Sequence, residues 1–144
     1  MANSQGVPTT DAYRLKAMSA IYPTSGIKAA LFLASATITP ATAAYTTSGE
    51  VSGSGYVAGG VAVTTTQVPQ ITGSTTYWTP AAAIAFGTVT LGTAFDCFML
   101  YDTGDSNANV FVGTFGSQTV TAATFTINMP TDDASTGLVR WAWS

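Results

Sequence analysis

From residue 27 to the end, short apolar runs alternate with clusters of turn-forming residues, and this pattern restricts the fold more than any other feature. In the run 123–129, apolar residues at every second position (Ala123, Phe125, Ile127 and Met129) alternate with Thr and Asn. Successive side chains of an extended strand point to opposite faces, so this run predicts a strand with one buried face. Gly, Pro, Asp, Ser and Asn mark nearly every junction between runs, as expected for turns. The chain is therefore predicted to be all-β.

The number and spacing of these runs predict an antiparallel β-sandwich or jelly roll of about eight strands, as a single domain over residues 11–144. The expected strands cover residues 27–34, 57–68, 71–79, 82–91, 95–102, 109–116, 123–129 and 138–143. A long loop, residues 35–56, separates the first two. Loops of this length are usually functional or packed against another surface.

The run 95–102 is apolar on both of its expected faces. One face would carry Phe95, Cys97, Met99 and Tyr101, and the other Phe98 and Leu100. Such a strand must be covered on both sides, by another sheet, a helix or another subunit. Cys97 is the only cysteine, which excludes an intrachain disulfide and a zinc site built on several cysteines. We expect it to be a small buried hydrophobe.

The N-terminal part is different in character. Residues 1–10 are small and polar and include Pro8, so we expect a flexible arm. Thr10 or Asp11 can cap a helix, because the side-chain oxygen accepts a hydrogen bond from a free N–H group of the first turn. The expected helix covers residues 12–20 and ends before Pro23.

Charged residues make up only 8% of the chain, compared with about 25% in an ordinary domain. The net charge of −3 and the presence of only four Lys and Arg residues argue against nucleic acid as a partner. No apolar run is long enough for a membrane-spanning helix, so no membrane association is expected. Weak charge repulsion favours self-association, and we expect a dimer, with a trimer as the alternative.

The tripeptide Asp102-Thr103-Gly104 is the one sequence motif that resembles a catalytic site, because aspartic proteases carry it on a turn. It occurs once, and Asp and Gly are also the usual residues of a hairpin turn, which is the expected reading. The chain has no histidine, so Ser/His/Asp and Cys/His catalytic sets are excluded. We expect no enzymatic activity and no cofactor.

Two ligand-binding patterns are incomplete. Asp102, Asp105, Asn107 and Asn109 offer oxygen atoms at a spacing that could hold Ca²⁺, but Gly113 stands where an EF-hand loop has its bidentate Glu. A solvated loop is the simpler expectation, and calcium stays an alternative. The run 53–58 matches a loose dinucleotide-binding pattern, but Val- and Thr-rich sequence follows it where a helix is required.

The stretch from Tyr45 to Gly60 reads Tyr-Thr-Thr-Ser-Gly-Glu-Val-Ser-Gly-Ser-Gly-Tyr-Val-Ala-Gly-Gly. With the preceding Lys-Ala-Ala-Leu-Phe run at 28–32, it resembles the capsid cement (decoration) proteins of short-tailed bacteriophages. The resemblance implies a structural virion protein assembled in the host cytoplasm. It would bind the outer capsid surface and clamp neighbouring subunits of the major capsid protein. The alternative is a tail, fibre or adhesin module for a host surface, which exposed aromatics at Tyr45, Tyr56, Tyr77 or Trp78 would favour.

Two sets of residues are the candidate contacts with the capsid or with another subunit. The first lies in the motif and consists of Glu50, Val51, Ser52 and Tyr56. The second lies at the C-terminal end and consists of Arg140, Trp141 and Trp143. Trp and Arg dominate interface hot spots. A terminal strand also commonly buries aromatic residues, so the tryptophans of the second set could equally belong to the hydrophobic core. Because the arm 1–10 and the loop 35–56 show no hydrophobic period, we expect the capsid surface to order them.

Overall fold

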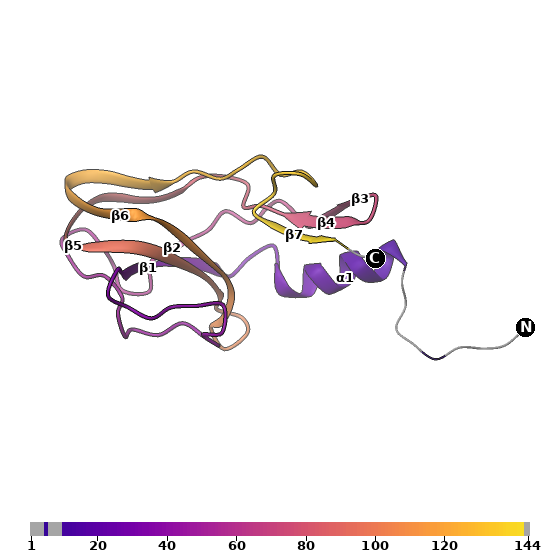
Figure 1. Cartoon of the computed structure of the whole chain (residues 1–144), viewed down its shortest axis with the longest axis horizontal. Coiled ribbons are helices and arrows are strands. Elements are labelled where there is room, and N and C mark those ends of the chain that lie inside the picture. The colour runs from indigo at the N-terminus through magenta and orange to yellow at the C-terminus, as the bar shows by residue number, and fades with distance from the viewer. Residues whose placement is uncertain (1–4, 6–9, 143–144) are drawn as a thin grey trace, which may run out of the picture.

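The computed structural model of this chain describes residue 5 and residues 10–142 (Figure 1). In this part of the chain, one helix is followed by seven strands, which form two antiparallel sheets. The predicted all-β class with one N-terminal helix is confirmed. Most of the arm expected at residues 1–10 lies outside the described residues.

The helix α1 (Asp11–Ile21) begins and ends one residue beyond its predicted limits. Thr10 is the N-cap residue, and its hydroxyl oxygen accepts a hydrogen bond from the backbone N–H of Tyr13 at 3.3 Å. On its inner side only Met18 is fully buried. The helix lies against β3 (Gln70–Thr72) and β4 (Thr75–Trp78).

The larger sheet has four strands, in the order β2 (Val61–Ala62), β1 (Ile27–Leu33), β5 (Ile84–Asp102) and β6 (Ala108–Ile127). The smaller sheet has the order β3, β4 and β7 (Val139–Ala142). Every pairing in both sheets is antiparallel.

The predicted strand boundaries were wrong in four places. The runs 82–91 and 95–102 form one strand, β5, because the residues between them make a β-bulge where a turn was expected. The runs 109–116 and 123–129 likewise form one strand, β6. The run 71–79 contains a hairpin, in which Gly73 takes a positive φ between β3 and β4. The run 57–68 yields only the two residues of β2.

The two long strands form a ribbon that folds back over itself, as Figure 1 shows at the end of the molecule opposite the helix. Aromatic rings from the two halves of the ribbon meet in the space between them. The rings of Phe95 and Phe125 lie edge to face with centroids 5.0 Å apart, and Phe86 and Phe115 also contact Phe125. Edge-to-face packing is favourable for aromatic rings, so this cluster holds the folded ribbon together.

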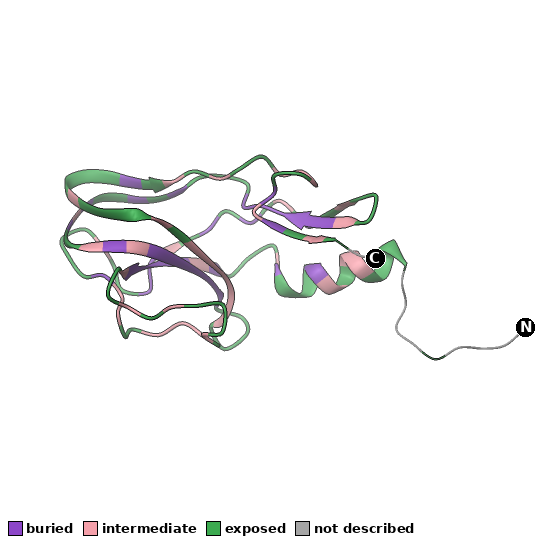
Figure 2. Cartoon of the chain, viewed as in Figure 1, coloured by how far each residue is buried: buried purple, intermediate pink, exposed green. Residues whose placement is uncertain are grey.

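Strand β1 is buried on both of its faces. Ala29 and Leu31 belong to the larger hydrophobic cluster, whereas Ala30 and Phe32 belong to a smaller one. The smaller cluster also contains Cys97, Met99 and Tyr101, and the long loop covers it with Ala36, Ile38 and Tyr45. Figure 2 shows buried residues along the middle of the four-stranded sheet and on β4 of the smaller sheet.

The predicted burial of both faces of 95–102 is therefore confirmed, and the chain's own loop supplies the cover on one side. The expected face of Phe95 was wrong. The register of β5 against β6 shifts between Phe95 and Cys97, so Phe95 turns to the larger cluster. Cys97 is buried, as expected.

Tyr22 connects the helix to both sheets. Its ring stacks on Trp78 of β4 with centroids 4.6 Å apart. Its hydroxyl donates a hydrogen bond to the backbone oxygen of Val110 in β6 at 2.8 Å.

Burial raises the pKa of Tyr22 from 10.0 to about 12. The folded-state pKa lies above the unfolded value, so burial of the neutral Tyr22 side chain contributes its full share to the free energy of unfolding below pH 10. As the pH rises from 10 toward 12, the free energy of unfolding falls by roughly 2–3 kcal/mol because the folded state resists ionisation of Tyr22. We expect Tyr22→Phe to reduce the alkaline decline of the unfolding free energy, measured by urea titrations at several pH values. An equal decline in both proteins would contradict this role.

Candidate functional site

Glu50, the only glutamate of the chain, organises the loop that contains the Tyr45–Gly60 motif. Its Oε2 accepts a hydrogen bond from the Tyr45 hydroxyl at 2.6 Å. Its Oε1 accepts from the Tyr56 hydroxyl at 2.8 Å and from the Gly59 N–H at 2.7 Å. The Tyr56 oxygen also accepts a hydrogen bond from the backbone N–H of Leu31 in β1 at 3.0 Å. We call these five residues the Glu50 clasp.

Tyr101 of β5 supports the clasp from the sheet. Its ring stacks on Tyr45 with centroids 4.6 Å apart, and its hydroxyl donates to the Gly59 backbone oxygen at 2.6 Å. Burial, followed by the Glu50 carboxylate, raises the pKa of both Tyr45 and Tyr101. The pKa of Tyr56 is raised mainly by burial. These hydroxyls therefore remain protonated at neutral pH and act as hydrogen-bond donors.

The glycines of the motif allow the loop backbone to lie directly against the larger sheet. A Cβ atom on Gly60 would stand 1.7 Å from the backbone oxygen of Ala29 in β1. A Cβ atom on Gly53 would stand 2.0 Å from the oxygen of Thr90 in β5, and one on Gly55 would stand 2.2 Å from the oxygen of Thr88. Any other residue at these positions would overlap with backbone atoms of the sheet.

Backbone hydrogen bonds join the same loop to both strands. Leu33 donates to the Gly49 oxygen at 2.8 Å, and Val51 donates to the Leu31 oxygen at 3.0 Å. On the other side, Thr90 donates to the Ser54 oxygen at 2.8 Å. The motif loop therefore covers one edge of β1 and part of one edge of β5.

The motif residues predicted as contacts with a partner occupy different environments. Val51 is buried with 4% of its surface exposed, and Glu50 and Tyr56 are half-buried members of the clasp. Ser52 alone of the four is exposed. The expectation that residues 35–56 lack internal reasons for order was wrong, because it overlooked the long-range contacts of the clasp.

Sequence reasoning missed Val57, which it placed at the start of a strand. Val57 is 71% exposed and stands in a turn closed by a hydrogen bond from the Gly60 N–H to the Val57 oxygen at 2.9 Å. It is the most exposed of the large hydrophobic residues that the structure describes. The signal in the sequence was the following Gly59-Gly60 pair, which is typical of a turn.

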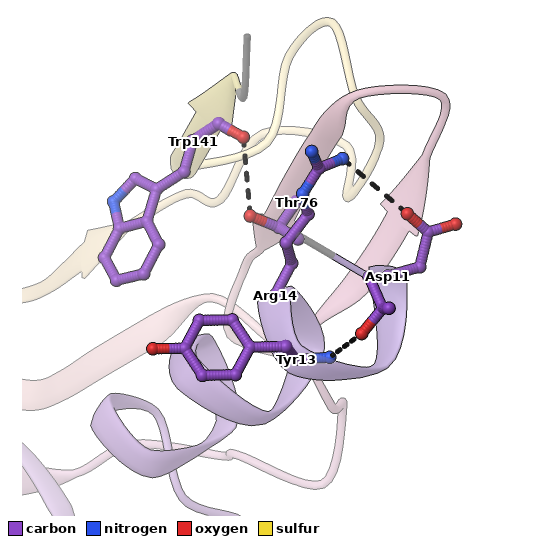
Figure 3. Close-up of polar contacts among 6 residues, drawn as sticks. Asp11, Tyr13, Arg14, Thr76 and Trp141 are labelled. Carbon is purple, nitrogen blue, oxygen red and sulfur yellow. Dashed lines mark hydrogen bonds and ion pairs between the residues drawn. The ribbon is translucent and has the colours of Figure 1, made fainter. Parts of the chain in front are cut away.

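Two residues of the C-terminal candidate set, Arg140 and Trp141, lie on β7. Trp141 is half-buried against the larger cluster, and its backbone oxygen accepts a hydrogen bond from the Thr76 hydroxyl at 3.4 Å (Figure 3). Arg140 is exposed and donates from Nη1 to the Ser135 oxygen. Trp143 lies outside the described residues. The structure therefore places Trp141 partly in the core and brings neither of these residues near the Glu50 clasp.

Figure 3 also shows the start of α1, which lies against β3 and β4. The Arg14 guanidinium pairs with the Asp11 carboxylate at 3.6 Å, where Asp11 is exposed. An exposed pair of this kind contributes less than about 1 kcal/mol to stability.

Asp102-Thr103-Gly104 begins the turn between β5 and β6, as predicted. Asp102 is 8% exposed, and its Oδ1 accepts a hydrogen bond from the Gly104 N–H at 2.8 Å. The Thr103 hydroxyl donates to the Gly26 oxygen at 2.8 Å. The carboxylate therefore stabilises the hairpin turn.

Of the four oxygen-bearing residues considered for calcium, Asn109 donates from Nδ2 to the Thr42 oxygen at 2.8 Å. Among the described residues, no three or more His, Cys, Asp or Glu side chains are grouped so that they could hold a metal ion. In the same part of the chain, no helix is long and apolar enough to cross a membrane.

Comparisons with known proteins add no relative to this picture: the chain matches no protein-family model, no curated protein and no solved structure.

Proposed function

We propose that this chain is a structural protein of a bacteriophage virion, a cement protein that binds the outer surface of the capsid. In this role it stabilises the contacts between neighbouring subunits of the major capsid protein. The finer fold that we propose is a β-sandwich of the jelly-roll kind, with the folded ribbon supplying both layers.

The observation that carries the proposal is that the residues of the Tyr45–Gly60 motif hold the motif loop on the larger sheet. Glu50, Tyr45 and Tyr56 form the clasp, and Gly53, Gly55 and Gly60 make the close approaches to the sheet. A protein family that shares these positions and spacings would need the same loop on the same sheet. This physical reason for the motif supports the resemblance to the cement proteins.

The surface that we propose for the capsid contact is the exposed part of this loop, residues 52–58. It carries no charged residue, and Val57 projects from it with 71% of its surface exposed. The clasp holds the loop in one conformation before binding, so little backbone entropy is lost when a partner covers it. A modest contact suffices, because a symmetric shell repeats it many times.

A tail, fibre or adhesin module would be favoured by exposed aromatic side chains, and the four aromatic residues considered for this role are not exposed. Tyr77 and Trp78 are buried, with exposed fractions of 7% and 0%. Tyr45 and Tyr56 are half-buried in the clasp. These four aromatic residues therefore do not form an exposed surface for a host ligand.

Val57→Asp is the direct test of this surface. We expect it to weaken binding to capsids that lack the chain by at least about tenfold, since it places a charge in an apolar contact. Co-sedimentation with such capsids over a range of protein concentrations would measure the change.

Val68→Asp is the matched control, because Val68 is 50% exposed and lies outside the motif. It should bind like the parent, and both variants should unfold at the parent's temperature. Unchanged binding by Val57→Asp would show that the contact lies elsewhere. Binding by none of the proteins, the parent included, would contradict the capsid role.

A further inference from the structure

The outer backbone edge of β6 at residues 113–127 is open, and we call it the β6 edge. Elsewhere in the larger sheet the chain supplies cover: Gly49, Val51 and β2 lie along β1, and Ser54 bonds to Thr90 of β5. The first residues of β6 are covered too, because Asn109 donates to the Ala43 oxygen and Val110 accepts from Tyr22. From 113 to 127, within the described chain, the backbone hydrogen bonds go only to β5.

An open edge of this length is unusual, because unpaired N–H and C=O groups readily pair with a strand of another chain. Proteins usually protect such edges with charged residues or proline. Residues 106–131 contain no charged residue, and their only proline is Pro130. Charge and proline, two of the usual protections against edge-to-edge pairing, are therefore absent from residues 113–127, and only the bulges of the β5–β6 pairing interrupt this edge.

The segment 123–127 is the last part of this edge, and its pairing with β5 shifts register once, between Thr126 and Thr124, where the extra residue belongs to β5. Ala122 has a positive φ of 47°, which interrupts the strand just before it. Phe125 is buried in the larger cluster, whereas Thr124 and Thr126 are exposed on the opposite face. The segment is thus an ordinary strand with one apolar face and one hydroxyl-bearing face.

We propose that segment 123–127 pairs antiparallel with the same segment of a second copy of this chain. With Phe125 on the twofold axis, Thr124 of one copy stands opposite Thr126 of the other, and Ala123 stands opposite Ile127. Every cross-strand pair then joins side chains of matching character without like charges, which favours pairing. The contact is isologous, so it closes at two copies.

This arrangement joins the two larger sheets into one continuous sheet, and it keeps the apolar faces on the same side. It does not depend on the proposed capsid role, because it rests only on the strand geometry and the sequence of the edge. A strand from another protein would not be expected to match the Thr124–Thr126 and Ala123–Ile127 pairs in this way.

The test is a set of charged variants examined by sedimentation velocity over a range of concentrations. The double variant Thr124→Lys/Thr126→Lys places like charges opposite each other at two cross-strand pairs. We expect the dissociation constant of its dimer to rise at least about tenfold. The variant Thr124→Lys/Thr126→Glu places opposite charges at the same pairs, so it should still form dimers.

Ala85→Lys/Thr88→Lys is the matched control. In the register of the ribbon, Ala85 pairs with Thr126 and Thr88 pairs with Thr124, so the charges stand one strand away from the edge. This control should form dimers like the parent. A parent that is monomeric, trimeric or forms open-ended assemblies would overturn the proposal. So would a dimer that is unaffected by Thr124→Lys/Thr126→Lys, or one that is lost equally in the control.

Discussion

Gly60→Ala should lower the free energy of unfolding by roughly 3 kcal/mol or more. The added methyl group would stand 1.7 Å from the Ala29 backbone oxygen, and Gly60 has a φ of +75°, which other residues reach with strain. The overlap is with the backbone of β1, so no side-chain rotation relieves it. Either the motif loop or the strand has to move. Urea unfolding followed by tryptophan fluorescence would measure the loss.

Substitutions at two other glycines distinguish the overlap with β1 from the strain of a positive φ. Gly73 has a φ of +59° and open space around it, so Gly73→Ala should show only the conformational strain, about 1–2 kcal/mol. Gly92 has open space and no positive φ, so Gly92→Ala should be close to neutral. If Gly60→Ala cost no more than Gly73→Ala, the close approach of the loop to β1 would be wrong.

Glu50→Ala should lower the free energy of unfolding by about 2–4 kcal/mol and release the motif loop from the sheet. The substitution leaves the hydroxyls of Tyr45 and Tyr56 and the Gly59 N–H without their acceptor. Leaving a buried donor unpaired costs about 1–3 kcal/mol, and water offsets part of this cost because the carboxylate is only half-buried. Amide hydrogen exchange should show faster exchange at Gly59 and across residues 45–60.

Asp105→Ala is the control for removing a carboxylate, since Asp105 is exposed in the β5–β6 turn. It should leave exchange in the motif loop unchanged. If Glu50→Ala also left the exchange of Gly59 unchanged, the carboxylate would not be holding the loop. Replacing Glu50-Val51-Ser52 with Gly-Ser-Gly should destabilise the fold for the same reason, and because it removes the buried Val51 side chain.

The parts of the fold that local sequence determines were predictable. The cap at Thr10 depends on neighbouring residues and is present in the structure. The alternation predicted over 123–129 is present only in part: Phe125 is buried between the exposed Thr124 and Thr126, but Ala123 is exposed and the strand ends at Ile127. The length of β5 was not predictable in this way, because Gly92 is typical of a turn and yet lies within a bulged strand. Only the pairing with β6 distinguishes the two outcomes.

The sequence indicated the motif loop as the candidate site but not the contacts that hold this loop on the sheet. The motif suggested Glu50, Val51 and Tyr56 as partner contacts, and the structure shows that all three also make contacts within the chain. The reason is long-range: Gly60 meets Ala29, and Gly53 meets Thr90. A linear sequence does not reveal which strands a glycine will approach. Val57 was missed because its β-branched side chain favours a strand, whereas the two glycines after it place it in a turn.

The copy number of this chain in purified particles tests the cement role most directly. Quantitative gel analysis of virions, with the major capsid protein as internal standard, would measure it. Our account predicts a copy number fixed by the symmetry of the shell and of the same order as that of the major capsid protein. A handful of copies per particle, or recovery with detached tails and not with capsids, would contradict it.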